Sequence, residues 1–246
     1  MSSMVARAAP ADRASAERGS VLQAIWADAG QPTGEVTTEE VRKILADGSA
    51  IVVDTRSAAE FAAGHLPGVR HIPTRADGPA AQYVEAVERL VGGQKTAALV
   101  LYCNGPFCKR TRSLGKHLVE AGFSNVRRYQ LGIPVWRALG GPTAIEIDGI
   151  LRIFGIDRTA LFFDARAPAD YARGSLAGAH NVPADDTPEE ITQAPLPRDD
   201  FNSRVVLFGR DGAQARKLAD ALGQTPFHNI LYFSGTYQAL AAAVGS

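Results

Sequence analysis

The sequence predicts an α/β fold of two tandem units, each a mainly parallel β-sheet flanked by helices. Two observations lead to this class. Short apolar segments alternate with segments of helical periodicity, which is typical of parallel sheets covered on both faces. In addition, residues 52–73 align without a gap to residues 162–183, so one α/β unit occurs twice along the chain.

The N-terminal region precedes the first unit. Residues 1 to about 15 have the composition of a disordered segment. Residues 16–29 place their apolar side chains on one face of a predicted helix, which the Gly-Gln-Pro sequence at 30–32 ends. Thr37 is expected to open another helix, because acidic residues follow it in the first turn, where the helix dipole favours them.

The first unit then alternates strands and helices. Residues 50–53 and 97–102 are predicted to be short buried strands, with a helix over residues 81–91 between them. Apolar residues at helical spacing over 114–119 predict another helix. The Gly-Gly-Pro sequence at 140–142 is the expected seam between the two units.

These boundaries divide the chain into three parts. We expect an N-terminal extension with a short helix, a catalytic first domain and an inactive second domain, over residues 1–34, 35–142 and 143–246.

Composition excludes several classes of partner. The 246 residues carry 26 basic and 26 acidic side chains, so no net field favours nucleic acid or a membrane surface. No apolar run approaches the roughly 18 residues of a membrane span, and the N-terminus lacks the apolar core of a secretory signal. Two cysteines are too few for a disulfide framework, so we expect a reducing, cytoplasmic location.

Both cysteines, Cys103 and Cys108, lie in one short segment, LVLYCNGPFCKRTRS at residues 99–113. Cys103 directly follows a buried parallel strand, so it should lie at the carboxyl edge of the sheet, where α/β folds place ligands. The next helix begins a few residues later. Its N-terminal N–H groups would stabilise a thiolate or a bound anion, as would nearby cations at Lys109, Arg110 and Arg112.

Three separated motifs carry a resemblance to a known family. Residues 54–68 have the pattern DxRxxxEFxxGHLPG, Tyr-Cys is followed by a loop, a helix and Ala-Gly-Phe at 121–123, and residues 131–136 are LGIPVW. These motifs resemble the rhodanese family of sulfurtransferases in its tandem two-domain form. The likeness covers residues 37–142, and the second copy, over about 149–244, is recognisable mainly through its first motif.

The resemblance implies a mechanism with two half-reactions and no metal or organic cofactor. The Cys103 thiolate attacks the outer sulfur of an anionic donor such as thiosulfate and becomes a persulfide. A thiol or cyanide then accepts that sulfur, and the thiol can belong to a protein. The residues expected to bind the substrate surround the cysteine: Asn104, Gly105, Phe107, Cys108, Lys109 and Arg110.

The cysteine loop departs from the family pattern. Six residues separate Cys103 from Arg110, whereas the common rhodanese loop has four and related phosphatases or arsenate reductases have five. A phosphatase or arsenate reductase of related fold is an alternative that the six-residue spacing does not favour. A redox or persulfide-sensing module that uses the two cysteines as a switch is a second alternative. Cys108 could be a resolving thiol, a second persulfide carrier or an incidental loop residue. Two cysteines without histidines at ligand spacing do not favour zinc.

The remaining candidates are expected to serve the fold. Asp54 and Arg56 recur in the second copy, which has no cysteine, so an internal salt bridge with Glu60 or a loop anchor is the preferred interpretation. His65 is expected to make a structural hydrogen bond rather than act as a general base. Trp136 is expected in the core.

Overall fold

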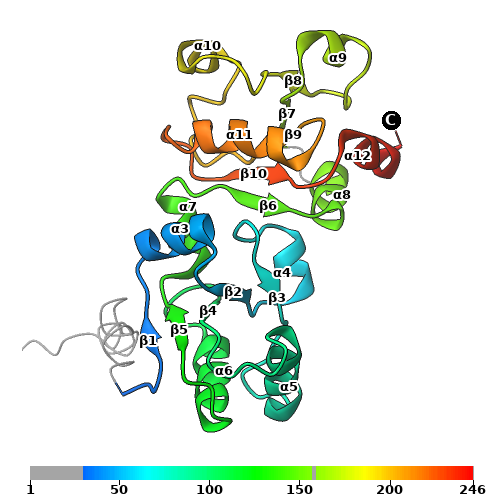
Figure 1. Ribbon diagram of the computed structural model, residues 1–246. Coiled ribbons are helices and arrows are strands. Elements are labelled where there is room, and N and C mark those ends of the chain that lie inside the picture. The colour runs from blue at the N-terminus through cyan, green and yellow to red at the C-terminus, as the bar shows by residue number, and fades with distance from the viewer. Residues whose placement is uncertain (1–29, 157–158, 246) are drawn as a thin grey trace, which may run out of the picture.

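The computed structural model describes residues 30–156 and 159–245, and these form two five-stranded sheets with helices around each (Figure 1). All strand pairs within both sheets are parallel. The predicted α/β class is therefore confirmed. The segment expected to be disordered and the helix expected over residues 16–29 lie outside the described residues.

The first sheet has the order β1-β5-β4-β2-β3. Its strands are β1 (Gly34–Glu35), β2 (Ile51–Asp54), β3 (Arg70–His71), β4 (Leu99–Tyr102) and β5 (Val126–Tyr129). The helices of this unit are α3 (Thr38–Asp47), α4 (Ala58–Ala62), α5 (Ala80–Leu90), α6 (Lys109–Glu120) and α7 (Gly132–Ala138). Strand β1 begins one residue before the predicted domain boundary at residue 35.

Strand β4 lies at the centre of this sheet and is buried on both faces. Leu99 and Leu101 join the apolar cluster formed with α5 and α6, whereas Val100 and Tyr102 join the cluster formed with α3 and α7. Alternate side chains of a strand point to opposite faces, so this short apolar run holds the two layers of helices together.

The second sheet repeats the same order, β6-β10-β9-β7-β8. Its strands are β6 (Thr143–Ile145), β7 (Leu161–Asp164), β8 (His180–Asn181), β9 (Val205–Phe208) and β10 (Ile230–Phe233). Its helices are α8 (Ile147–Ile156), α9 (Pro168–Ala172), α10 (Pro188–Gln193), α11 (Gly212–Leu222) and α12 (Tyr237–Val244). The repeat found in the sequence thus corresponds to a repeat of topology.

The two units meet through backbone contacts. His65 and Ala144 exchange both N–H···O bonds, at 2.9 and 2.8 Å, and the Glu146 N–H donates to the Ala62 carbonyl at 3.0 Å. At Gly149 in α8, a Cβ would lie 2.1 Å from the same Ala62 oxygen, so only glycine allows this approach. The start of the second unit is therefore packed directly on helix α4.

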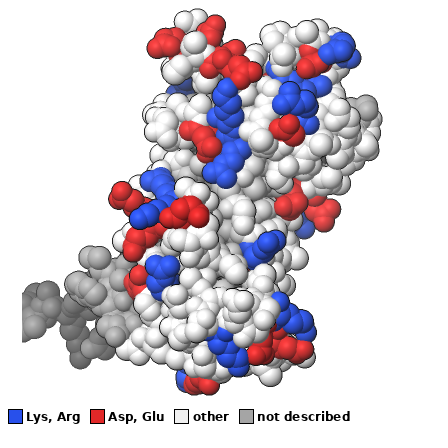
Figure 2. Space-filling view, in the orientation of Figure 1, with Lys and Arg blue, Asp and Glu red and all other residues white. Residues whose placement is uncertain are grey.

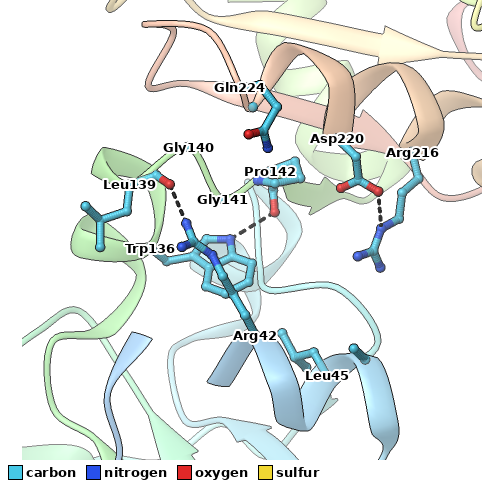
Figure 3. A pocket seen from close by; sticks show the side chains of 12 residues that line it. Arg42, Leu45, Trp136, Leu139, Gly140, Gly141, Pro142, Arg216, Asp220 and Gln224 are labelled. Atoms are coloured by element: carbon cyan, nitrogen blue, oxygen red, sulfur yellow. Dashed lines mark hydrogen bonds and ion pairs between the residues drawn. The ribbon is translucent and has the colours of Figure 1, made fainter. Parts of the chain in front are cut away.

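A cavity of about 440 Å³ lies between the units, next to the 140–142 segment (Figure 3). From the first unit, the Arg42 guanidinium lies over the Trp136 ring and donates to the Leu139 carbonyl. Trp136 is buried as expected and donates its indole N–H to the Pro142 carbonyl at 3.0 Å. The second unit contributes the Arg216–Asp220 ion pair to the opposite wall.

Acidic and basic side chains are interspersed over the face that Figure 2 shows. Among the residues that the structure describes, no helix is both long and apolar enough to cross a lipid bilayer.

Candidate functional site

Cys103 lies immediately after the central strand β4, at the carboxyl edge of the first sheet, and is 2% exposed. Its carbonyl accepts a hydrogen bond from the Ile133 N–H at 3.1 Å. Gly132 has a φ of 65°, and a Cβ there would lie 2.3 Å from the same carbonyl. The N-terminus of α7 therefore packs against the backbone of the cysteine, which no side chain larger than hydrogen at position 132 would allow.

The loop over residues 103–108 joins β4 to α6 and contains a disulfide between Cys103 and Cys108, whose Cα atoms are 6.3 Å apart. Cys108 is the N-cap residue of α6, and its N–H donates to the Gly105 carbonyl at 3.0 Å. Gly105 has a positive φ of 106°, a conformation suited to glycine. Among the three roles considered for Cys108, the role of a resolving thiol is the one that would produce this disulfide.

The cysteine loop has backbone donors without protein acceptors. Across the described residues, the N–H groups of loop and first-turn positions 104, 105, 107, 109 and 110 donate to no protein oxygen. Such donors, together with the positive end of the helix dipole, favour an anion near the start of α6.

Glu60 connects two site residues that are far from it in sequence. Its carboxylate accepts from the Arg110 guanidinium at 2.8 Å and from the Asn104 side-chain amide. The same carboxylate closes the capping box of α4 with Ser57. Partial burial acts to raise the pKa of Glu60, but the hydrogen bonds from Ser57, Arg110 and Asn104 outweigh it and lower the pKa to about 2. Glu60 therefore stays ionised at neutral pH and orients the loop.

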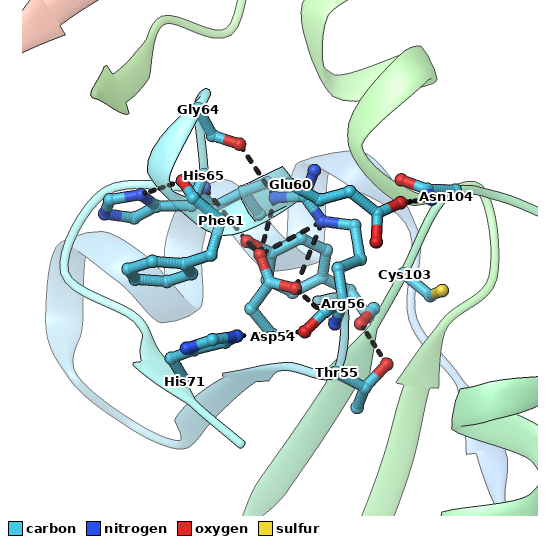
Figure 4. A network of polar contacts seen from close by, with 12 residues as sticks. Asp54, Thr55, Arg56, Glu60, Phe61, Gly64, His65, His71, Cys103 and Asn104 are labelled. Carbon is cyan, nitrogen blue, oxygen red and sulfur yellow. Dashed lines mark hydrogen bonds and ion pairs between the residues drawn. The ribbon is translucent and has the colours of Figure 1, made fainter. Parts of the chain in front are cut away.

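The expected salt bridge between Arg56 and Glu60 is wrong. Arg56 instead pairs with Asp54 at 2.6 Å and donates to the Gly64 carbonyl at 2.7 Å (Figure 4). The reason is geometric, because the capping box holds Glu60 toward the cysteine loop while the fork of Arg56 engages both Asp54 oxygens. The loop-anchor alternative is the one confirmed.

The same buried network includes the residue before Cys103. The Tyr102 hydroxyl donates to Asp54 and accepts from the Leu66 N–H at 3.1 Å. Burial and the neighbouring Asp54 raise the pKa of Tyr102 well above its ordinary value. Figure 4 shows Cys103 beside this network, at the end of its strand. The network thus fixes the strand end from which the cysteine projects.

His65 makes the structural hydrogen bond that was expected. Its Nδ1–H donates to the Phe61 carbonyl at 3.0 Å, and its ring stacks on Phe61 with centroids 3.7 Å apart. Burial lowers the pKa of His65 to about 4, so the imidazole is neutral at pH 7.

A surface depression of about 510 Å³ opens beside the cysteine loop. Five of the predicted substrate-binding residues line it: Asn104, Phe107, Cys108, Lys109 and Arg110. Gly105 and Cys103 are buried and do not line it, whereas Phe107 is 63% exposed at its rim. Arg75 and Asp77, on the segment between β3 and α5, complete the wall. Sequence reasoning missed these two, and their only signal was a position after a strand of the same sheet.

The corresponding edge of the second unit is built differently. Gly209 stands at the position of Cys103, and residues 209–211 replace the six-residue loop. The Asp211 side chain caps α11 by accepting from the Gln214 N–H, and the Gln214 side chain accepts from the Arg210 N–H. A Cβ at Gly209 would lie 3.0 Å from the Gln214 side-chain oxygen. The Arg210 N–H of this loop is thus already used internally, and the edge carries no thiol.

The model of the rhodanese-like domain matches this chain twice, over residues 37–139 and 153–243. The chain belongs to the rhodanese-like family. Both of its sheets therefore correspond to rhodanese-like domains, and the cysteine loop lies in the first of them.

Curated relatives include proteins of two kinds. An HTH-type transcriptional regulator, Rv0324, of Mycobacterium tuberculosis is 29% identical over 113 residues, which are 46% of this chain and 46% of the regulator. The thiosulfate sulfurtransferase GlpE of Pseudomonas putida is 29% identical over 103 residues, which are 42% of this chain and 84% of GlpE. The rhodanese-like chain thus spans less than half the length of the first of these relatives.

Solved structures give more distant likenesses. A thiosulfate sulfurtransferase from Pseudomonas aeruginosa matches 86% of this chain and 45% of its own at 22% identity, with a TM-score of 0.37. Wild-type EanB matches 86% of this chain and 61% of its own at 18% identity, with a TM-score of 0.36.

Proposed function

We propose that this rhodanese-like protein is a sulfurtransferase that carries sulfane sulfur as a persulfide on Cys103. The observation that carries the proposal is the position of Cys103, directly after the central strand and before a loop that leads into α6. Membership in the rhodanese-like family and relatives with the name thiosulfate sulfurtransferase support it.

In the first half-reaction, the Cys103 thiolate attacks the outer sulfur of thiosulfate, the bond between the two thiosulfate sulfurs breaks, and sulfite leaves with its electron pair. The N–H groups without protein acceptors at the start of α6 stabilise the thiolate and then the persulfide. Lys109 and Arg110 at the rim attract the anionic donor.

Glu60 keeps Arg110 in place without being a group that reacts. The ion pair between the Glu60 carboxylate and Arg110 fixes the orientation of the guanidinium and neutralises part of its charge. Gly105 gives the loop its turn, and the Asn104 amide, held by the same Glu60, fixes the first loop residue.

In the second half-reaction, a thiol or cyanide takes the outer sulfur and restores the Cys103 thiolate. The disulfide between Cys103 and Cys108 must be reduced before the first half-reaction, because the nucleophile is the thiolate. We expect activity only in protein that has been treated with a reductant.

The test is intact-protein mass spectrometry of the reduced Cys108→Ser variant after thiosulfate treatment, because Cys103 is then the only cysteine that can carry sulfur. The expected result is the added mass of one sulfur atom on Cys103, together with thiosulfate-to-cyanide transfer by the wild type under reducing conditions that Cys103→Ser abolishes. Near-normal turnover of folded Cys103→Ser would show that the nucleophile is another group.

The disulfide itself favours one other function, a redox or persulfide-sensing module. Reversible disulfide formation without any release of sulfite from thiosulfate would support that function over the enzymatic one.

A further inference from the structure

The two cysteines of the loop lie at different depths in the site. Cys103 is buried at the strand end, whereas Cys108 is partly exposed and lines the surface depression. Even so, their sulfurs are bonded, so the loop brings Cys108 directly to the inner sulfur of any group carried on Cys103.

On the basis of the proposed persulfide, we propose that Cys108 resolves it within the protein and releases sulfide. The Cys108 thiol gives its proton to the outer sulfur of the Cys103 persulfide and attacks the Cys103 Sγ. The bond between Cys103 Sγ and the outer sulfur breaks, and a hydrosulfide ion leaves with the electron pair. The two cysteines are oxidised to the disulfide, and the sulfane sulfur is reduced to sulfide.

The two possible attacks of Cys108 on the persulfide have different products. Attack by Cys108 on the outer sulfur would only move the persulfide from one cysteine to the other and would form no protein disulfide. Attack on the inner sulfur produces the Cys103–Cys108 bond that the structure contains.

The local electrostatics suit Cys108 to this role. It is the N-cap residue of α6 and is followed by Lys109 and Arg110, and both features stabilise a thiolate. Because the attacking thiol is on the same loop and its sulfur can reach the Cys103 Sγ, the attack is an intramolecular reaction that does not require an external thiol to enter the site. The internal reaction therefore competes with transfer to a small external acceptor and completes the turnover when no such acceptor is present.

The cycle closes only with an external dithiol, which reduces the Cys103–Cys108 disulfide and is itself oxidised. Over a full cycle, one thiosulfate and one dithiol give one sulfite, one sulfide and one dithiol-derived disulfide.

A single-turnover experiment tests the inference. Protein is reduced, freed of reductant under anaerobic conditions and mixed with thiosulfate, and then sulfite, sulfide and the mass of the protein are measured. The wild type should release sulfite and sulfide in equal amounts and end as the disulfide. Cys108→Ser should release sulfite and keep the added sulfur, with sulfide at least tenfold lower.

The serine variant is the suitable one, because a serine hydroxyl is a good helix N-cap and preserves the start of α6. Cys103→Ser is the control and should release neither product. If the wild type releases sulfite but retains a persulfide and no sulfide, the resolving role is wrong while the sulfurtransferase proposal stands. If reduced wild type releases no sulfite, both are wrong.

Discussion

At the residue scale, Glu60 shows how one carboxylate can organise a site that it does not react in. It joins the cap of α4 to Arg110 and Asn104, and its pKa is lowered to about 2 from an ordinary value of 4.5. A carboxyl whose pKa is depressed by folding contributes stability above its unfolded pKa, and this contribution is lost as the pH falls through the folded value.

Glu60→Gln should therefore lower the free energy of unfolding of the protein at pH 6 relative to the wild type. The difference should shrink between pH 4.5 and pH 2, because over this range the wild-type carboxyl becomes protonated in the unfolded and then in the folded protein. Urea denaturation at several pH values measures it. A difference that is constant with pH would mean that the charge of Glu60 does not stabilise the fold.

Arg110→Ala should raise the KM for thiosulfate more than it lowers kcat. One charge-assisted contact contributes about 1.5–3 kcal/mol, which corresponds to roughly a tenfold change or more. Lys116→Ala is the matched control, since Lys116 is an exposed cation on the same helix that pairs with Glu120 and does not line the depression. Equal KM values for the two variants would place Arg110 outside the binding site.

At the scale of the element, the contact between α7 and the cysteine depends on Gly132. Gly132→Ala should destabilise the protein by at least about 1–2 kcal/mol, because a side chain at positive φ is strained and its Cβ would strike the Cys103 carbonyl. The sulfur-transfer activity should fall as well, because the displaced carbonyl is that of Cys103, the proposed nucleophile.

Gly68→Ala separates the two effects. Gly68 has a similar φ of 70°, but a Cβ there would meet no atom within 4 Å. It should show only the strain, measured by urea denaturation, and full sulfur transfer. Equal losses of stability and activity in both variants would remove the case that α7 positions Cys103.

The loop of the second unit gives the other prediction at this scale. A protein with both Gly209→Cys and Cys103→Ser should not transfer sulfur from thiosulfate to cyanide. The new Cβ would press on Gln214, and the three-residue loop has too few unpaired N–H groups to form an anion site. Measurable turnover in this variant would show that the short loop of the second unit can support sulfur transfer.

At the scale of the whole molecule, helix α8 of the second unit packs on helix α4 of the first, which carries Glu60. A fragment that ends at residue 141 loses the backbone pairing of His65 with Ala144 and the packing of α8 on α4. We expect this fragment to have a lower melting temperature than the first unit within the full chain, or an altered preference among sulfur donors. Unchanged stability and kinetics would show that the second unit is not a support.

Some of this organisation could be predicted from sequence and some could not. The repeat and the alternation of apolar and helical segments were sufficient for the fold, and the strand before Cys103 was sufficient to place the cysteine at the sheet edge. The partner of Arg110 could not be predicted from the sequence, because Glu60 is 50 positions away and could have paired with Arg56 instead. The state of the cysteines also depends on loop geometry, which spacing alone leaves open.

The two ends of the cysteine bridge are anchored to different extents. Cys103 is buried at a strand end, and its carbonyl accepts from the Ile133 N–H, whereas Cys108 is partly exposed, and its N–H donates to the Gly105 carbonyl of the same loop. When the disulfide is reduced, the backbone of Cys103 should keep its position, whereas the backbone of Cys108 should move away from it. The NMR chemical shifts of the backbone amides over residues 104–109 should then differ between the oxidised and the reduced protein. The shifts of the amides at the N-terminus of α7 should not change.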